Sequence, residues 1–111
     1  MFTSIHSLDE VQHFIQKEEF PFIYVSKKDC SVCHGLLPQV EKVLAKYPRI
    51  KGALIDADEI PEFSGQYTVF TVPALLLFYD GKEQFRDVRF VPMQAFEEKV
   101  KRIYTQLVEL S

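Results

Sequence analysis

The sequence predicts an α/β fold in which helices cover both faces of a mixed central sheet of four to five strands. Patterns typical of helices and of strands alternate along all 111 residues. Two short apolar runs, 21–25 and 53–55, lie on either side of a long helical pattern, which indicates a βαβ unit. An Asp-Gly pair between two further strand-like runs indicates a hairpin. A chain of this length suits one hydrophobic core, so we expect residues 1–111 to form a single domain.

A helix and a buried strand are predicted first. Ser7 and Glu10 have the spacing of a capping box, and apolar residues then recur on one face of a helix over 8–18. The mostly apolar run 21–25 is bounded by a proline and by polar residues, which is typical of a strand buried on both faces.

A long helix is predicted after Cys30, because apolar residues repeat at helical spacing as far as Pro48. Pro38 lies inside this run and is expected to bend the helix, since proline has no amide donor. A second buried strand at 53–55 and a short helix over 59–66 follow.

The last third of the chain is predicted to form an antiparallel hairpin and a closing helix. Strand-like residues 74–79 and 82–89 flank Asp80-Gly81, a pair that tolerates the positive φ of a tight primed turn. Pro92 suits the first position of a helix, and apolar residues at helical spacing follow it.

Charge and hydropathy exclude several classes of protein. The 13 Lys and Arg are scattered among 16 Asp and Glu, for a net charge of −3, so nucleic acid is not an expected partner. The longest apolar run, 72–79, is far shorter than the ~20 residues of a membrane-spanning helix, so no membrane association is expected. Residues 1–10 lack the features of a secretory signal. We therefore expect a cytoplasmic protein, and a monomer.

Both cysteines lie in one short string, Cys30-Ser31-Val32-Cys33-His34, between a predicted buried strand and the start of a predicted helix. A cysteine at the start of a helix meets unpaired amide donors and the positive end of the helix dipole, both of which favour the thiolate. Two thiols three positions apart can also close a disulfide across one turn. Such a pair can cycle between dithiol and disulfide.

Three other interpretations of the cysteines are weighed against this one. Two free thiols can simply be small buried hydrophobes. A zinc site takes three or four protein ligands, and besides the cysteines the chain offers only His6, His13 and His34, unless a metal bridges two chains. The string is also an attachment signature for haem c, which would use Met1, Met93 or a histidine as axial ligand. The strand before Cys30 favours redox exchange, and we assign no metal ligand.

Four segments together resemble the thioredoxin family over nearly the whole chain. These are the Cys-x-x-Cys string at a helix start, Pro38 five residues beyond it, the strand 53–56, and the segment 71–78 (Thr-Val-Pro-Ala-Leu-Leu-Leu-Phe). The resemblance implies a thioredoxin-like fold with a cis Val72–Pro73 bond facing the cysteines. It also implies that the backbone of Val72 pairs with an extended substrate peptide.

The sequence departs from the family pattern around the cysteines. Typical thioredoxins have Trp-Cys-Gly-Pro-Cys-Lys, whereas this chain has no tryptophan and carries Asp29, Ser31, Val32 and His34 in the corresponding places. Tyr24 replaces the family's buried Asp, and Gly52 replaces its buried Lys, with Lys51 one position away. A phenol is a poor base at neutral pH, so we expect slower disulfide reduction than in a standard thioredoxin.

The resemblance implies a thiol–disulfide oxidoreductase in which Cys30 attacks, Cys33 resolves and Pro73 faces them, with no cofactor. Its partners would be protein disulfides and an electron donor such as a thioredoxin reductase or a low-molecular-weight thiol. We expect an apolar docking rim made by Ser31, Val32, Val72, Pro73 and the loop at Phe90.

Charged and polar neighbours are expected to modulate the cysteine pair. A protonated His34, one helical turn from Cys30, would stabilise its thiolate, or else is a solvated surface histidine. Lys27 and Lys28 favour the thiolate and Asp29 opposes it, while Tyr24 modulates the resolving step. The alternative function is a thioredoxin-fold adaptor that senses redox state with little general reductase activity.

Overall fold

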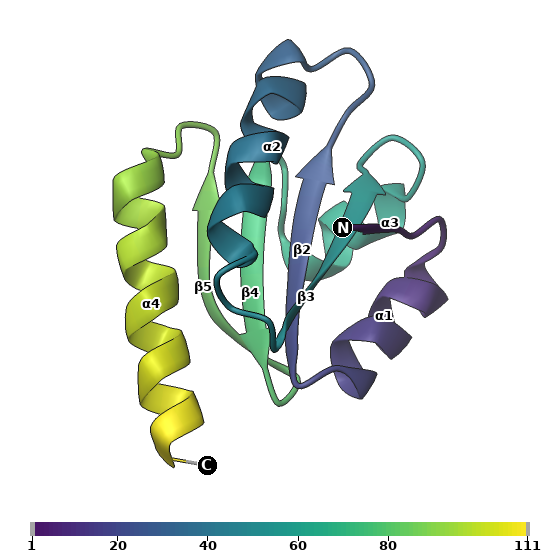
Figure 1. Cartoon of the computed structure of the whole chain (residues 1–111). Helices are drawn as coiled ribbons and strands as arrows, with labels where there is room; N and C mark the ends of the chain where they lie inside the picture. The colour runs from purple at the N-terminus through teal and green to yellow at the C-terminus, as the bar shows by residue number, and fades with distance from the viewer. Residues whose placement is uncertain (1, 111) are drawn as a thin grey trace.

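The central sheet of the computed structural model has five strands in the order β1-β3-β2-β4-β5 (Figure 1). The structure describes residues 2–110, so the two ends of the predicted domain 1–111 lie outside the described residues. Its elements are β1 (Thr3–Ser4), α1 (Leu8–Lys17), β2 (Phe20–Ser26), α2 (Ser31–Leu44), β3 (Ile50–Asp56), α3 (Pro61–Tyr67), β4 (Ala74–Tyr79), β5 (Lys82–Val88) and α4 (Met93–Leu110).

The sheet is mixed, as predicted. Strands β2 and β3 are parallel and joined by α2, which completes the expected βαβ unit. Strand β4 runs antiparallel to both β2 and β5. The turn between β4 and β5 has φ of 52° at Asp80 and 78° at Gly81, which are the positive values that a primed hairpin turn requires.

Helices cover both faces of the sheet and form two separate core clusters (Figure 1). Helices α1 and α3 pack on one face through residues such as Val11, Ile15 and Phe63. Helices α2 and α4 pack on the other face through residues such as Val40 and Phe96. None of the helices in residues 2–110 is both long enough and apolar enough to cross a membrane.

The structure corrects the predicted elements chiefly in three places, and α3 runs from Pro61 to Tyr67 where 59–66 was predicted. Strand β1 was not predicted, because Thr3–Ser4 is short, polar and exposed, and it pairs with β3 only at Ala53 and Leu54. Strand β3 begins three residues earlier than predicted, since Lys51 and Gly52 hide its apolar pattern. Helix α4 begins at Met93, one residue after the proline proposed as its first position.

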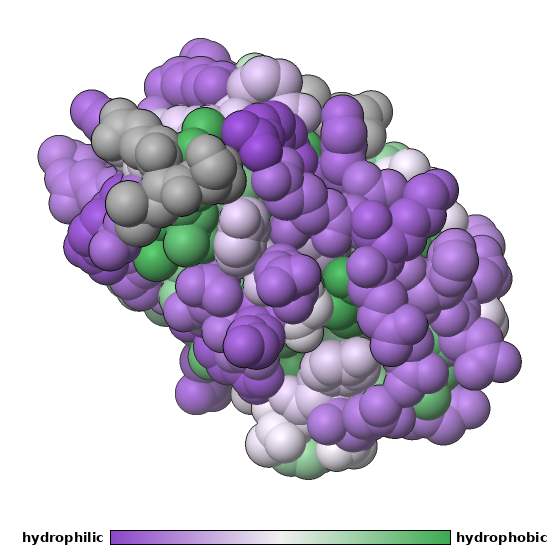
Figure 2. Space-filling view, turned by 90° about the horizontal axis from the view of Figure 1, so that it is seen from below, coloured by the Kyte–Doolittle hydropathy of each residue, from purple (hydrophilic) through white to green (hydrophobic). Residues whose placement is uncertain are grey.

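The two ends of the sheet carry different features of the fold. The end that carries the β4–β5 turn is covered mostly by hydrophilic side chains, with hydrophobic ones scattered among them (Figure 2). The other end is formed by the carboxyl ends of β2, β3 and β5 and by the start of β4. Helix α2 also begins at this second end, so both cysteines lie there (Figure 1).

Candidate redox site at the start of helix α2

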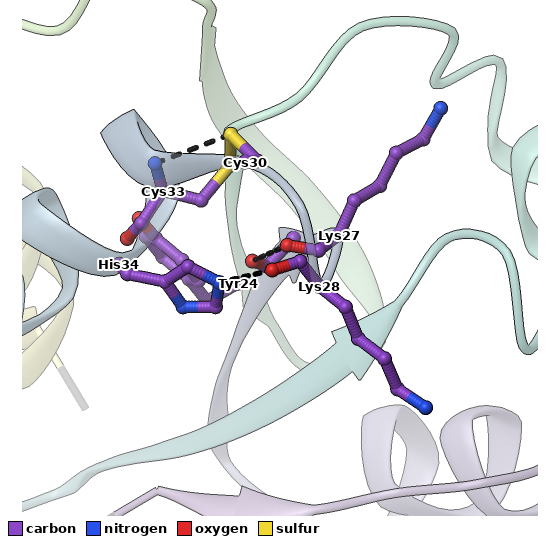
Figure 3. The surroundings of a disulfide bond; sticks show 7 residues. Tyr24, Lys27, Lys28, Cys30, Cys33 and His34 are labelled. Atoms are coloured by element: carbon purple, nitrogen blue, oxygen red, sulfur yellow. Dashed lines mark hydrogen bonds between the residues drawn. A yellow bond between two sulfur atoms is a disulfide. The ribbon is translucent and has the colours of Figure 1, made fainter.

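The cysteine pair lies where the chain passes from β2 into α2 (Figure 3). Cys30 is the N-cap residue of α2, and Cys33 lies in its first turn. The two are joined by a disulfide, with their Cα atoms 5.3 Å apart. Cys33 has no exposed surface, whereas Cys30 is only partly buried. An approaching molecule therefore meets Cys30 first.

The start of α2 places amide donors around Cys30. The Cys33 amide donates to Cys30 Sγ at 3.2 Å, and the His34 amide donates to the Cys30 carbonyl oxygen at 3.3 Å. The first turn of α2 contains no acidic residue. In the reduced protein, this amide and the positive end of the helix dipole favour a negative charge on Cys30 Sγ.

Tyr24 lies on β2 beneath the disulfide and is fully buried. Its hydroxyl donates to the Cys33 carbonyl oxygen at 2.6 Å. Burial raises the pKa of this phenol to about 12, so it keeps its proton throughout the neutral range. Tyr24 is therefore a hydrogen-bond donor that holds the first turn of α2 against the sheet, and it is unsuited to accept a proton from Cys33.

Phe2 fills the space beside Tyr24 that the missing side chain of Gly52 leaves open. A Cβ atom built on Gly52 would clash with the Phe2 ring. The Phe2 ring also lies 6.3 Å from the Tyr24 ring and 5.8 Å from the Phe22 ring, centroid to centroid. An aromatic cluster thus occupies the region where the family has a buried Asp and Lys. The sequence signal for it was the glycine at the lysine position, but its aromatic partner could not be predicted.

His34 points away from the sulfur atoms (Figure 3). Its Nε2–H donates to the Lys28 carbonyl oxygen at 2.8 Å, because a carbonyl can only accept. The side chains of Lys27 and Lys28 also extend away from the disulfide (Figure 3). The ammonium group of Lys27 lies 3.8 Å from Asp58. The modulating role assigned to His34 stays a prediction.

The residues of the predicted docking rim lie at the same end of the sheet as Cys30. The Val72–Pro73 bond is cis, as the resemblance implied, and Pro73 itself is buried. Cys30 and Val72 both pack against the core cluster that contains Cys33. Ser31 and Val32 are exposed in the first turn of α2, and Phe90 is 84% exposed after β5.

Two further residues at this rim were not predicted. Phe70 is 77% exposed just before the Val72–Pro73 segment. Arg89 lies beside Pro73, where its amide donates to the Pro73 carbonyl oxygen at 2.8 Å. Phe70 could have been found from the sequence, because it is an aromatic residue close to the Val72–Pro73 segment. Arg89 could not, because its position next to Pro73 results from the pairing of β4 with β5.

A pocket of about 160 Å³ lies behind the start of α2. His6 and His34 both line it, together with Ser26 and Asp56. His6 is engaged by Glu59, with 2.9 Å between Nδ1 and Oε1. Across the described side chains of residues 2–108, no group of three or more His, Cys, Asp or Glu is placed to share a metal ion.

Comparison with known proteins identifies the family. The sequence model of the thioredoxin family matches residues 3–105. The chain is 48% identical over 102 residues to the thioredoxin-like protein YdfQ of Bacillus subtilis strain 168, covering 92% of this chain and 91% of that protein. This chain belongs to the thioredoxin family.

Proteins named thioredoxin also match this chain, at lower sequence identity. The thioredoxin of Bacillus subtilis strain 168 is 32% identical over 74 residues, which cover 66% of this chain and 71% of that protein. The crystal structure of thioredoxin from Trypanosoma brucei brucei superposes with a TM-score of 0.85 at 18% identity, covering 95% of this chain and 92% of that one. The predicted thioredoxin-like fold is therefore confirmed.

Proposed function

We propose that this thioredoxin-family chain is a thiol–disulfide oxidoreductase that acts as a reductant in the cytoplasm. The thiolate of Cys30 attacks one sulfur of a partner disulfide, forming a mixed disulfide and releasing the other partner sulfur as a thiolate. Cys33 then loses its proton and attacks Cys30 Sγ, which forms the Cys30–Cys33 bond and releases the second partner sulfur. Two electrons pass to the partner, and no cofactor is needed.

The observation that carries this proposal is the unequal burial of two cysteines close enough to bond. Cys30 is partly exposed and accepts an amide hydrogen bond at a helix start, while Cys33 is fully buried behind it. A nucleophile needs access and a stabilised thiolate, whereas a resolving thiol needs only to reach the first sulfur. Cys30 suits the first role and Cys33 the second.

The resolving step is proposed to be the slow one. Cys33 must give up a proton before it attacks, and the Tyr24 phenol has a pKa of about 12 and itself donates to the Cys33 carbonyl oxygen. Water or another group must then accept the proton, so the mixed disulfide should persist longer than in a family member with a buried carboxylate.

Protein disulfides are the proposed substrates, and they would dock on the rim, where Val32, Val72 and Phe90 offer apolar surface. An extended segment of the partner would pair with the backbone of Val72. The resulting Cys30–Cys33 disulfide would be returned to the dithiol by a thioredoxin reductase or a low-molecular-weight thiol. These assignments extend to this chain what its family membership implies.

Insulin reduction driven by a supplied dithiol tests the enzymatic proposal. The wild-type protein should accelerate precipitation of the insulin B chain, and Cys30→Ser should reduce the rate to that of the dithiol alone. Cys33→Ser is the matched control, because it keeps the attacking thiol and should accumulate a mixed disulfide with insulin. Equal rates for wild type and Cys30→Ser would contradict the proposal.

A redox-sensing adaptor is the second candidate, and the Tyr24 contact favours it. A pair without a proton acceptor turns over slowly, which suits a protein that holds one partner more than one that serves many. Trapping with Cys33→Ser in cell extract separates the two functions. Many mixed disulfides would support general exchange, whereas one dominant partner, together with a rate in the insulin assay near background, would support the adaptor.

A further inference from the structure

Arg89 holds an unusual backbone position next to the proposed docking rim. Its φ is 72°, in the left-handed region that glycine adopts freely and most residues avoid. The position is fixed on both sides, because the Arg89 amide donates to the Pro73 carbonyl oxygen at 2.8 Å and the Phe90 amide donates to the Val88 carbonyl oxygen at 2.9 Å. Such an outlier beside a functional segment indicates a role for the side chain that it displays.

The guanidinium group of Arg89 is exposed and uncompensated. No carboxylate among the side chains that the structure describes, those of residues 2–108, forms an ion pair with it. The acidic residue nearest in sequence, Asp87, is already paired with Lys99 at 2.6 Å. An unpaired positive charge therefore lies on the Pro73 side of the rim, facing solvent.

Exposed hydrophobic side chains lie at the same end of the sheet as this charge. Among residues 2–108, the exposed large hydrophobic residues all lie at the disulfide end of the sheet: Val32, Phe70, Val88 and Phe90. The opposite end is mostly hydrophilic (Figure 2). Apolar patches of this kind mark interaction surfaces, and charged groups at their edge decide which partner docks.

We propose that Arg89 is a specificity-determining residue that selects partner segments carrying an acidic side chain among apolar ones next to their disulfide. The inference rests on the proposed exchange reaction and names its substrate class. The apolar side chains would pack on Phe70 and Phe90, while the carboxylate would pair with the Arg89 guanidinium. Arg89 takes no part in the electron transfer itself, which stays between the sulfur atoms.

Synthetic peptide disulfides test the selection. Three peptides share one apolar sequence around the disulfide and differ only in a flanking Glu, Gln or Lys. The pre-reduced wild-type protein should reduce the Glu peptide about two- to fivefold faster than the Lys peptide at low ionic strength, since an exposed ion pair has that strength. The difference should shrink as salt is added, because salt screens exposed charges.

Variants at Arg89 test whether this residue causes the difference in reduction rate between the Glu and Lys peptides. The Glu-to-Lys rate ratio should fall to about one in Arg89→Gln, reverse in Arg89→Glu, and persist in Arg89→Lys. Lys82→Glu is the matched control, because it makes the same charge change at the β4–β5 turn, and its ratio should equal the wild-type ratio.

Two different failures can be distinguished. A ratio that is unchanged in both Arg89→Gln and Arg89→Glu, with normal reduction of the Gln peptide, would overturn the selection by Arg89 and leave the exchange reaction standing. Failure of the wild-type protein to reduce even the Gln peptide would instead overturn the proposed function.

Discussion

Tyr24 shows how one buried group can change a site without removing its cysteines. Its hydroxyl donates to the Cys33 carbonyl oxygen, and burial raises its pKa from 10 to about 12. The folded chain therefore retains a proton that the unfolded chain releases above about pH 10. Stability due to this group is fully present below pH 10 and is lost as the pH rises towards 12.

The Tyr24→Phe variant should show both effects of this hydroxyl. At pH 7 it should lower the free energy of unfolding by about 1 kcal/mol, because one buried hydrogen bond is lost. Above pH 10 the variant should lose less stability than the wild type, because it has no phenol that ionises more readily in the unfolded chain than in the folded one. The difference between the two pKa values, about two units, corresponds to about 3 kcal/mol. Urea unfolding from pH 7 to 12 measures both. If the free energies of unfolding of the two proteins changed in parallel with pH above 10, the pKa assigned to Tyr24 would be contradicted.

Strand β3 contains Gly52, whose missing side chain leaves room for the Phe2 ring. Gly52→Ala places a methyl group against the Phe2 ring, so the ring must move out of its contacts with Phe22 and Tyr24. We expect a loss of about 1–2 kcal/mol in the free energy of unfolding, measured by urea denaturation. Phe2→Ala combined with Gly52→Ala should cost less than the sum of the single changes.

Gly65→Ala is the control for this substitution. Gly65 lies in α3 with open space around its Cα, and alanine favours a helix, so this variant should be about 0.5–1 kcal/mol more stable than the wild type. A Gly52→Ala protein as stable as the wild type would show that Phe2 is not held between β3 and β2.

Arg89, in the connection between β5 and α4, has a left-handed backbone conformation that is unfavourable for a residue with a side chain. Arg89→Gly should raise the free energy of unfolding by about 0.5–1 kcal/mol, because glycine adopts a φ of 72° without the left-handed penalty of about 1–2 kcal/mol. Arg89→Ala is the matched control, since it removes the charge but keeps Cβ and should bring no gain. Thermal unfolding measures both, and equal melting temperatures for the two variants would contradict the backbone argument.

At the scale of the whole molecule, the sequence predicted the parts that are set by apolar pattern and turn chemistry. Periodicity placed α1, α2 and α4, the Asp80-Gly81 pair placed the hairpin, and the Cys-x-x-Cys string placed the disulfide at a helix start. Strand β1 escaped prediction because two exposed polar residues carry no pattern. The adjacency of Arg89 to Pro73 escaped because it depends on a register shift between Leu77 and Phe78, which the turn residues do not predict.

Phe70 precedes β4 and Phe90 follows β5, so both exposed rings belong to the end of the sheet that carries the disulfide. Phe70 and Phe90 are 77% and 84% exposed, so their replacement by serine should leave the melting temperature unchanged. Each replacement should lower kcat/KM for insulin about fivefold, because about half of a ring would be buried in the complex. Reduction of a small aromatic disulfide, which needs no docking surface, is the control. Equal slowing of both substrates would show that the rings act on the cysteines and not on docking.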